Sequence, residues 1–143
     1  MKMKKMMNNK YVLIIEKDEM LITTLTEFAK TENIGMAQFT MIGAIKDVTL
    51  GYIAEAKTTY QWKHFAGQWE LLLASGNISW DQNQQQPVIH CHLTMSNHTF
   101  NVTGGHLQDG TVALKAEVIV EILSNEKIKQ TIDKNTNFTV WDI

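Results

Sequence analysis

One amphipathic helix in a chain that is otherwise rich in strand-forming residues is the feature that most restricts the fold. Within residues 18–32, apolar side chains are spaced i, i+1, i+4, i+7 and i+8, which places them on one face of a helix. Asp18 is expected to cap its N-terminus, and Asn33 and Gly35 supply stop signals at its end. The apolar positions are Leu21, Ile22, Leu25, Phe28 and Ala29. This stripe indicates packing against a core and carries no chemistry by itself.

Runs of β-branched and aliphatic residues fill most of the remaining chain and predict a sheet. The segments 62–67 and 82–86 are expected to be loops between strands. The expected strands are residues 11–15, 37–54 with a break at Gly43, 69–80, 88–95, 99–103, 111–114, 116–123 and, as a closing edge strand, 138–141. The predicted class is therefore α+β, a mostly antiparallel sheet flanked by a few helices. We expect one domain over residues 11–143 after a flexible tail over residues 1–10.

The composition is that of a soluble globular protein and argues against an autonomous nucleic-acid binder. Hydrophobic residues make up 44% of the chain and charged residues 20%, which are ordinary values. All 13 basic residues are lysine, so every mechanism that needs an arginine fork on phosphate or guanine is excluded within the chain. The formal net charge of -2 also lacks the basic balance of a DNA-binding domain.

The cysteine content and the absence of long apolar runs indicate a cytoplasmic protein. The single cysteine, Cys91, cannot form an intrachain disulfide, which fits a reducing compartment. No apolar run approaches the roughly 18–20 residues that span a bilayer. The basic start of the chain is not followed by an apolar signal-peptide core. We therefore expect no membrane partner.

Three histidines predict a metal site on the sheet. His90 and His92 are two apart on an expected strand, so their imidazoles point to the same face and Cys91 points to the other. A reversal centred near Asn97 would place His106 beside His90. Three converging imidazoles suit zinc or a similar divalent metal, although each histidine could also be an ordinary polar strand residue. The two other histidines, His64 and His98, are expected to be solvated in a loop and a turn.

A series of short stretches extends over most of the chain. These are Met41-Ile42-Gly43-Ala44-Ile45, Val48-Thr49-Leu50-Gly51-Tyr52, Trp69 to Ile78, Pro87-Val88-Ile89-His90-Cys91-His92-Leu93, Gly104-Gly105-His106-Leu107 and Ala116-Glu117-Val118-Ile119-Val120. In their order and spacing they resemble the prokaryotic PPC domain, the plants and prokaryotes conserved domain. The resemblance covers about residues 11–123. It depends on all of these stretches together, since no one stretch is diagnostic alone.

The resemblance implies a homotrimer with a metal site. In prokaryotic members the His-x-His strand and the Gly-Gly-His segment form a metal-binding constellation, which carries over onto His90, His92 and His106. Zinc is the expected metal because the ligands are three imidazoles without a thiolate. Gly104 and Gly105 are expected to form a turn that aims His106 at the metal, with a β-bulge or a plain strand end as the alternative.

The favoured function is a metal-dependent one, either binding of a small ligand or an enzymatic reaction whose catalytic residues and substrate the sequence does not identify. Three histidine ligands leave an open position at which a metal can act on water or a carbonyl group. Glu70 and Glu117 are candidates for an acid or base near the metal, and the alternative is that each is a rim or trimer-contact carboxylate.

Two other functions stay open. Plant members of the family are DNA-associated through a separate AT-hook, which this arginine-free chain lacks, so DNA binding is disfavoured. A structural or partner-binding trimer is the third hypothesis, with tryptophans as interface anchors. The tryptophans concerned are Trp62, Trp69, Trp80 and Trp141.

Overall fold

The computed structural model describes residues 1–53 and 59–143, which form one α-helix and nine β-strands. The strands β1 to β5 are Lys2–Lys5, Lys10–Ile15, Met36–Ile53, Tyr60–Trp80 and Pro87–Ser96. The strands β6 to β9 are Val102–Leu107, Val112–Ser124, Gln130–Ile132 and Thr139–Trp141, and the helix α1 is Leu21–Thr31. No helix among the described residues is long and apolar enough to cross a membrane.

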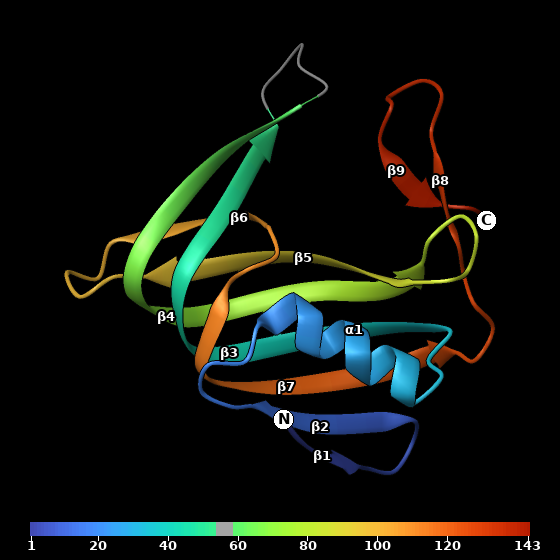
Figure 1. The fold of residues 1–143 in the computed structure, drawn as a ribbon, viewed down its shortest axis with the longest axis horizontal. Helices are drawn as coiled ribbons and strands as arrows, with labels where there is room; N and C mark the ends of the chain where they lie inside the picture. Colours follow the sequence, from blue (N-terminus) through green and yellow to red (C-terminus); the bar gives the residue numbers. More distant parts are fainter. Residues whose placement is uncertain (54–58) are drawn as a thin grey trace.

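Seven strands form one antiparallel sheet that curls back on itself. Their order is β1-β2-β7-β3-β4-β5-β6, and β6 also pairs with the far end of β3, where Gly51 is opposite His106. The long strands β3 and β4 make this possible, because their outer halves rise together from the sheet and the outer half of β3 pairs with β6 (Figure 1). A separate hairpin, β8–β9, stands apart from the outer halves of β3 and β4, on the right in Figure 1.

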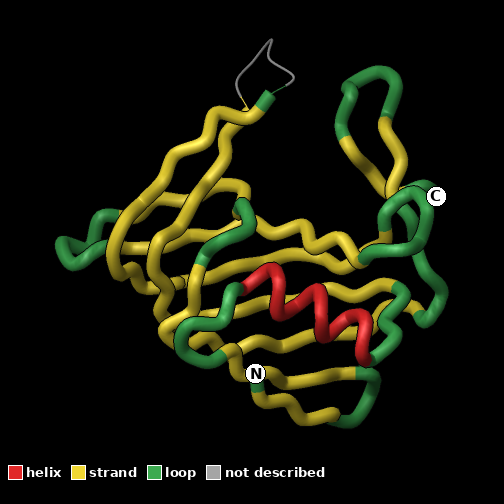
Figure 2. Tube along the Cα trace, in the orientation of Figure 1, coloured by secondary structure: helices red, strands yellow, loops and turns green. Residues whose placement is uncertain are grey.

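The hydrophobic core lies between α1 and one face of the sheet (Figure 2). Alternate residues of β2, namely Tyr11, Leu13 and Ile15, are buried there, as the period-two pattern of a half-covered strand requires. From the helix, Phe28 packs edge-on against Tyr11 with the ring centroids 5.2 Å apart. Each large side chain buried in this way contributes roughly 1.5–3 kcal/mol, so the helix stripe is a major source of stability.

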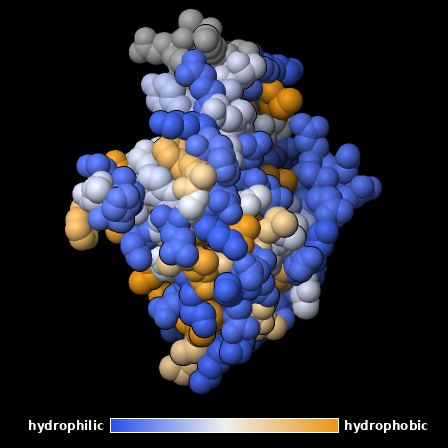
Figure 3. Space-filling model, turned by 60° about the vertical axis from the view of Figure 1, so that its left-hand side comes forward, coloured by the Kyte–Doolittle hydropathy of each residue, from blue (hydrophilic) through white to orange (hydrophobic). Residues whose placement is uncertain are grey.

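The opposite face of the sheet carries apolar side chains that no described residue covers. Val12, Ile14, Ile42 and Ile119 are all exposed, and they line a groove of about 410 Å³ over β2, β7 and β3. In Figure 3, which shows one side of the molecule, apolar residues lie in small groups among hydrophilic ones. An exposed apolar groove of this kind is typical of a contact surface.

The predicted α+β class is confirmed: the chain forms one domain with a mostly antiparallel sheet and one described helix, where the sequence predicted a few helices. The expected break at Gly43 is also present, as a register shift between β3 and both of its neighbours in that region. One strand, β7 (Val112–Ser124), takes the place of the two predicted segments 111–114 and 116–123.

Several predicted boundaries are wrong. The helix begins at Leu21, and Asp18 does not cap it: this residue has φ 68° and its carboxylate pairs with Lys46 at 2.8 Å. The predicted tail of residues 1–10 contains β1, which pairs with β2, because main-chain hydrogen bonds to an edge strand need no apolar pattern. The predicted loop 62–67 belongs to β4. The predicted edge strand 138–141 is β9, and it pairs with β8 and not with the main sheet.

Candidate metal centre

The strands β5 and β6 bring the three predicted histidines together on the sheet face opposite the core. Cys91 is buried in the core, so His90 and His92 on either side of it point the other way, as predicted. His106 pairs directly with His92. The predicted partner, His90, is wrong by two residues. A shift of the strand register by two residues keeps every side chain on the same face of the sheet, so the three imidazoles still converge.

The register error has its origin in the turn between β5 and β6. The Asn97 side chain accepts hydrogen bonds from the backbone N–H groups of Thr99 and Asn101, each at 3.0 Å. The Asn97 N–H donates to the Asn101 carbonyl oxygen at 3.2 Å. These bonds centre the reversal on Thr99 and not on Asn97, and the centre of the turn sets the register of the hairpin.

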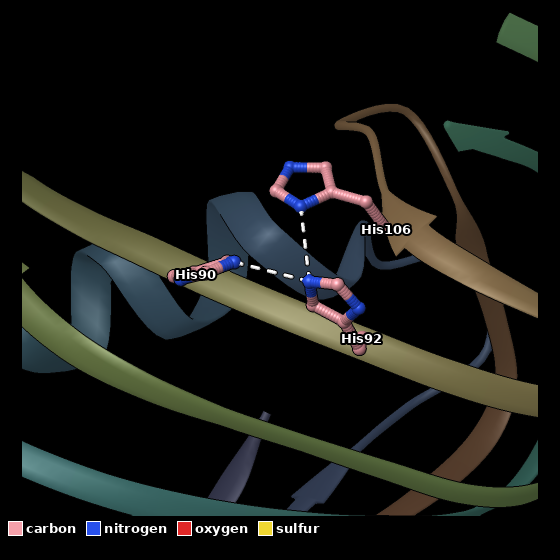
Figure 4. A group of neighbouring side chains, drawn as sticks. All are labelled: His90, His92 and His106. Carbon is pink, nitrogen blue, oxygen red and sulfur yellow. Dashed lines mark hydrogen bonds between the residues drawn. The ribbon is translucent and has the colours of Figure 1, made fainter. Parts of the chain in front are cut away.

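The nitrogen atoms of the three rings have the spacing of metal ligands. Nε2 of His90 lies 3.2 Å from Nε2 of His92, which in turn lies 3.4 Å from Nδ1 of His106. Figure 4 shows these nitrogens directed toward one another from β5 and β6. Two ligands of a tetrahedral zinc ion at about 2.0–2.1 Å would be about 3.3–3.4 Å apart, so the observed separations fit the edges of such a tetrahedron. All three nitrogens lie within 4.8 Å of one another, and the group could hold a metal ion.

The surroundings of His90 and His106 favour the neutral form of the imidazole, which is the form that binds metals. Burial, together with the nearby His90 and His92 rings, lowers the pKa of His106 to about 4. Burial and the neighbouring His92 also lower the pKa of His90. Neutral imidazoles offer a lone pair to a cation, so the site is prepared for a metal at neutral pH.

Two aromatic residues that the sequence did not assign to the site lie against His106. The Tyr60 ring lies 4.7 Å from the His106 ring and stacks on Trp62 at 5.0 Å. The Tyr60 hydroxyl is 3.5 Å from Nδ1 of His106. Both aromatic rings pack over Gly51, where a Cβ would lie 2.6 Å from the Trp62 ring. The i, i+2 spacing of Tyr60 and Trp62 is a strand signal, which the prediction of a loop at 62–67 obscured.

The histidines line a pocket of about 670 Å³. One side is formed by the ends of β3 and β4 and by β5, and the other side by the hairpin β8–β9. Besides the histidines, the described lining residues are Ile53, Tyr60, Val88, Ile89, Gln130, Asn137, Phe138, Thr139 and Val140. This volume suits a small organic molecule.

The glycine pair does not form the predicted turn: Gly104 and Gly105 lie within β6, and neither has a positive φ. Gly105 permits close packing, because a Cβ there would lie 2.9 Å from the Gly51 carbonyl oxygen. The contact lets β6 approach β3 next to His106. Close packing of β6 on β3, and not a bend, is therefore what Gly105 provides next to His106.

The two predicted carboxylates are not brought to the histidines. Glu70 is opposite Ser96 on β5, four residues beyond His92, or about 13 Å along the strand. Glu117 lies on β7, three strands from β5, and lines the apolar groove on the sheet. Of the other histidines, His64 and His98 are exposed as predicted, although His64 lies in β4.

The fold and the histidine group together define a small antiparallel β protein with a site that could hold a metal. Residues 3–124 match the family model of the Plants and Prokaryotes Conserved domain, and the chain belongs to this family. The resemblance seen in the sequence is thereby confirmed. None of the curated proteins matches this chain.

Solved structures with the same fold include three that are similar along nearly the whole chain. A plant- and prokaryote-conserved protein from Pyrococcus horikoshii is 30% identical, with TM-score 0.85, over 94% of this chain and 91% of that one. A metal-containing protein from Archaeoglobus fulgidus is 28% identical, with TM-score 0.84, over 92% and 91%. A candidate DNA-binding protein from Bacteroides thetaiotaomicron is 28% identical, with TM-score 0.88, over 99% and 96%.

Proposed function

We propose that this protein binds one zinc ion per chain and uses it to hold a small ligand. The atoms that would coordinate zinc are Nε2 of His90, Nε2 of His92 and Nδ1 of His106. The observation that carries the proposal is the 3.2 and 3.4 Å separation of these nitrogens, which matches tetrahedral coordination. The similarity to a metal-containing protein supports it. With three protein ligands, zinc would act as a Lewis acid toward a ligand at the fourth position.

The chain's own residues prepare this site. The paired strands β5 and β6 hold the three imidazoles before any metal arrives, which reduces the entropy lost on binding. The low pKa of His106 removes the competition with protons at neutral pH. The Tyr60 hydroxyl, next to His106, is a hydrogen-bond donor for a bound ligand.

We also propose that the protein is a homotrimer whose subunits meet through the exposed apolar groove. Val12, Ile14, Ile42 and Ile119 would be buried in that contact, which accounts for their exposure in a single chain. Glu117, which lines the same groove, would then be a contact carboxylate and not a catalytic group. We place the trimer in the cytoplasm, since its single cysteine is a buried free thiol.

DNA binding is the second candidate, and the name of the Bacteroides thetaiotaomicron protein is what favours it. The net charge of -2 and the lack of arginine count against it, because DNA affinity depends mainly on cationic contacts to phosphate. If the chain binds DNA, a mobility-shift assay will show an affinity that falls steeply with salt concentration. Zinc content and DNA binding can thus be tested separately.

The experiment that tests the metal site is elemental analysis of the purified, untagged protein after incubation with zinc and removal of the excess. We expect one zinc per chain in the wild type and none in the His90→Ala/His92→Ala variant. The matched control is His64→Ala/His98→Ala, which removes two exposed histidines outside the site and should keep the zinc. Equal zinc content in the two double variants would refute the proposed site.

A further inference from the structure

The hairpin β8–β9 forms a wall of the histidine pocket, although it lies beyond the part of the chain that matches the family model. That match ends at residue 124, whereas the hairpin begins at Gln130. Its pocket-lining residues are Gln130, Asn137, Phe138, Thr139 and Val140. The metal-ligating histidines therefore come from the family domain and much of the facing wall comes from outside it, which is where selectivity for a ligand is expected to reside.

Hydrogen bonds fix the base of this hairpin to β4 and close its tip. At its base, the Trp80 N–H donates to the Ile128 carbonyl oxygen at 2.9 Å, and the Gln130 side chain donates to the Ser79 hydroxyl at 3.0 Å. At its tip, the N–H of Asn137 donates to the carbonyl oxygen of Asp133 at 2.8 Å. The base of the wall is thus fixed before a ligand binds, which reduces the ordering that binding requires there.

The apolar side chains of the hairpin are not used by the hydrophobic core. Phe138 is 44% exposed and Val140 is 41% exposed, and both line the pocket. Tyr60 adds an aromatic ring near the histidines. These groups offer an apolar surface to a ligand, and the amides of Gln130 and Asn137 are the polar groups of the hairpin wall.

The charge of the pocket defines the other part of the ligand. A divalent metal with three neutral imidazoles carries a charge of about +2, and no residue among the described lining is acidic. The ligand is therefore expected to be an anion. Among anions, a carboxylate fits this lining best, because it can carry the apolar body that Phe138 and Val140 would contact.

Building on the zinc site proposed above, we infer that the pocket binds a small organic carboxylate with an aromatic or branched apolar body. Its carboxylate faces the three-histidine centre and accepts a hydrogen bond from the Tyr60 hydroxyl. Its apolar body lies against Phe138 and Val140 of the hairpin. Phe138 is thus the residue that selects an apolar ligand, while the histidines alone determine that the ligand is an anion.

The inference can be tested with three probes on the protein loaded with Co²⁺, a spectroscopic substitute for zinc with similar ligand preferences. The probes are benzoate, acetate and inorganic phosphate. Binding is followed by the visible Co²⁺ absorption and by the fluorescence of Trp62, whose ring lies 6.0 Å from that of His106. We expect benzoate to bind about tenfold more tightly than acetate, since only benzoate buries a ring, and more tightly than phosphate.

Three variants test the roles assigned to the hairpin and to Tyr60. Phe138→Ser should reduce the benzoate-to-acetate ratio to near one while the Co²⁺ content stays unchanged. Phe100→Ser is the matched control, because Phe100 is 86% exposed in the β5–β6 turn and does not line the pocket. Tyr60→Phe should weaken the binding of both carboxylates by a similar factor.

The outcomes distinguish failure of the ligand inference from failure of the proposed metal site on which it rests. If the wild type binds no Co²⁺ or zinc, the metal proposal fails and the ligand inference fails with it. If the metal binds but benzoate and acetate bind equally, or phosphate binds most tightly, the ligand inference alone is overturned. A benzoate preference that survives Phe138→Ser would likewise overturn the role of the hairpin.

Discussion

His92 and His106 are direct cross-strand partners on β5 and β6, and their Nε2 and Nδ1 atoms lie 3.4 Å apart. His92 also lies next to His90, with 3.2 Å between the two Nε2 atoms. Both short separations therefore share one atom, Nε2 of His92. The geometry makes this side chain the centre of the group, and a substitution there disrupts both pairs.

We predict that His92→Ala removes the zinc without unfolding the protein. Loss of a direct ligand should weaken zinc affinity by about 100-fold or more, since even outer-sphere partners are worth about 10–100-fold. The side chain is exposed, so the free energy of unfolding of the metal-free protein should change by no more than about 0.5 kcal/mol. Zinc titration and urea unfolding measure the two effects, with His98→Ala as the control. Unfolding of the metal-free variant would contradict the prediction.

The metal-free protein should lose stability as the pH falls from about 6.5 to about 4. The pKa of His106 is about 4 in the folded chain, lowered by burial and by His90 and His92, against about 6.5 in an unfolded one. Between these values the unfolded state binds more protons, so acidification favours unfolding. Urea unfolding at several pH values measures the effect. The variant His106→Gln should show a shallower decline, and an unchanged decline would contradict this assignment.

Cys91 should be nearly inert in the native protein. Burial raises the pKa of its thiol to about 12, so almost no thiolate is present at pH 8, and the side chain lies on the core face of β5, opposite Gly76 of β4. Alkylation by iodoacetamide, followed by mass spectrometry, should be slow in buffer and complete in urea. Rapid labelling of the folded protein would show that β5 opens readily.

Gly105→Ala should destabilise the protein and weaken metal binding together. The new Cβ would lie 2.9 Å from the Gly51 carbonyl oxygen and 3.3 Å from Cβ of Leu50, so β6 must move away from β3 beside His106. We expect a cost of roughly 1–3 kcal/mol in the free energy of unfolding. The control is Gln108→Ala, an exposed position just after β6. Wild-type zinc affinity in Gly105→Ala would show that the β3–β6 contact does not position His106.

The proposed trimer contact predicts that charge in the apolar groove separates the subunits. The Ile42→Lys/Ile119→Lys variant would bury two unpaired charges at that contact, which disfavours association. Light scattering after gel filtration should give a trimer for the wild type and a monomer for the variant. Phe100→Lys, in the exposed β5–β6 turn, should remain a trimer. If the Ile42→Lys/Ile119→Lys variant remains a trimer, the subunits meet through another surface.

Features that depend on neighbouring residues could be predicted from the sequence. The apolar stripe of α1 and the shared face of His90 and His92 follow from the periods of helix and strand, which are local properties. The motifs also identified the family correctly. The convergence of His106 was predicted even with the wrong register, because an error of two residues leaves the face unchanged.

The sequence by itself thus determined the class of fold and the three residues of the candidate metal centre, through period and spacing, and the family, through the resemblance of its motifs. Only the tertiary structure decided what surrounds the histidines. The Asn97 turn sets the register, the β3–β6 contact brings Tyr60 to His106, and the β8–β9 hairpin supplies Phe138. These contacts join segments far apart in sequence, and their formation depends on loop closure and packing, which no local pattern encodes.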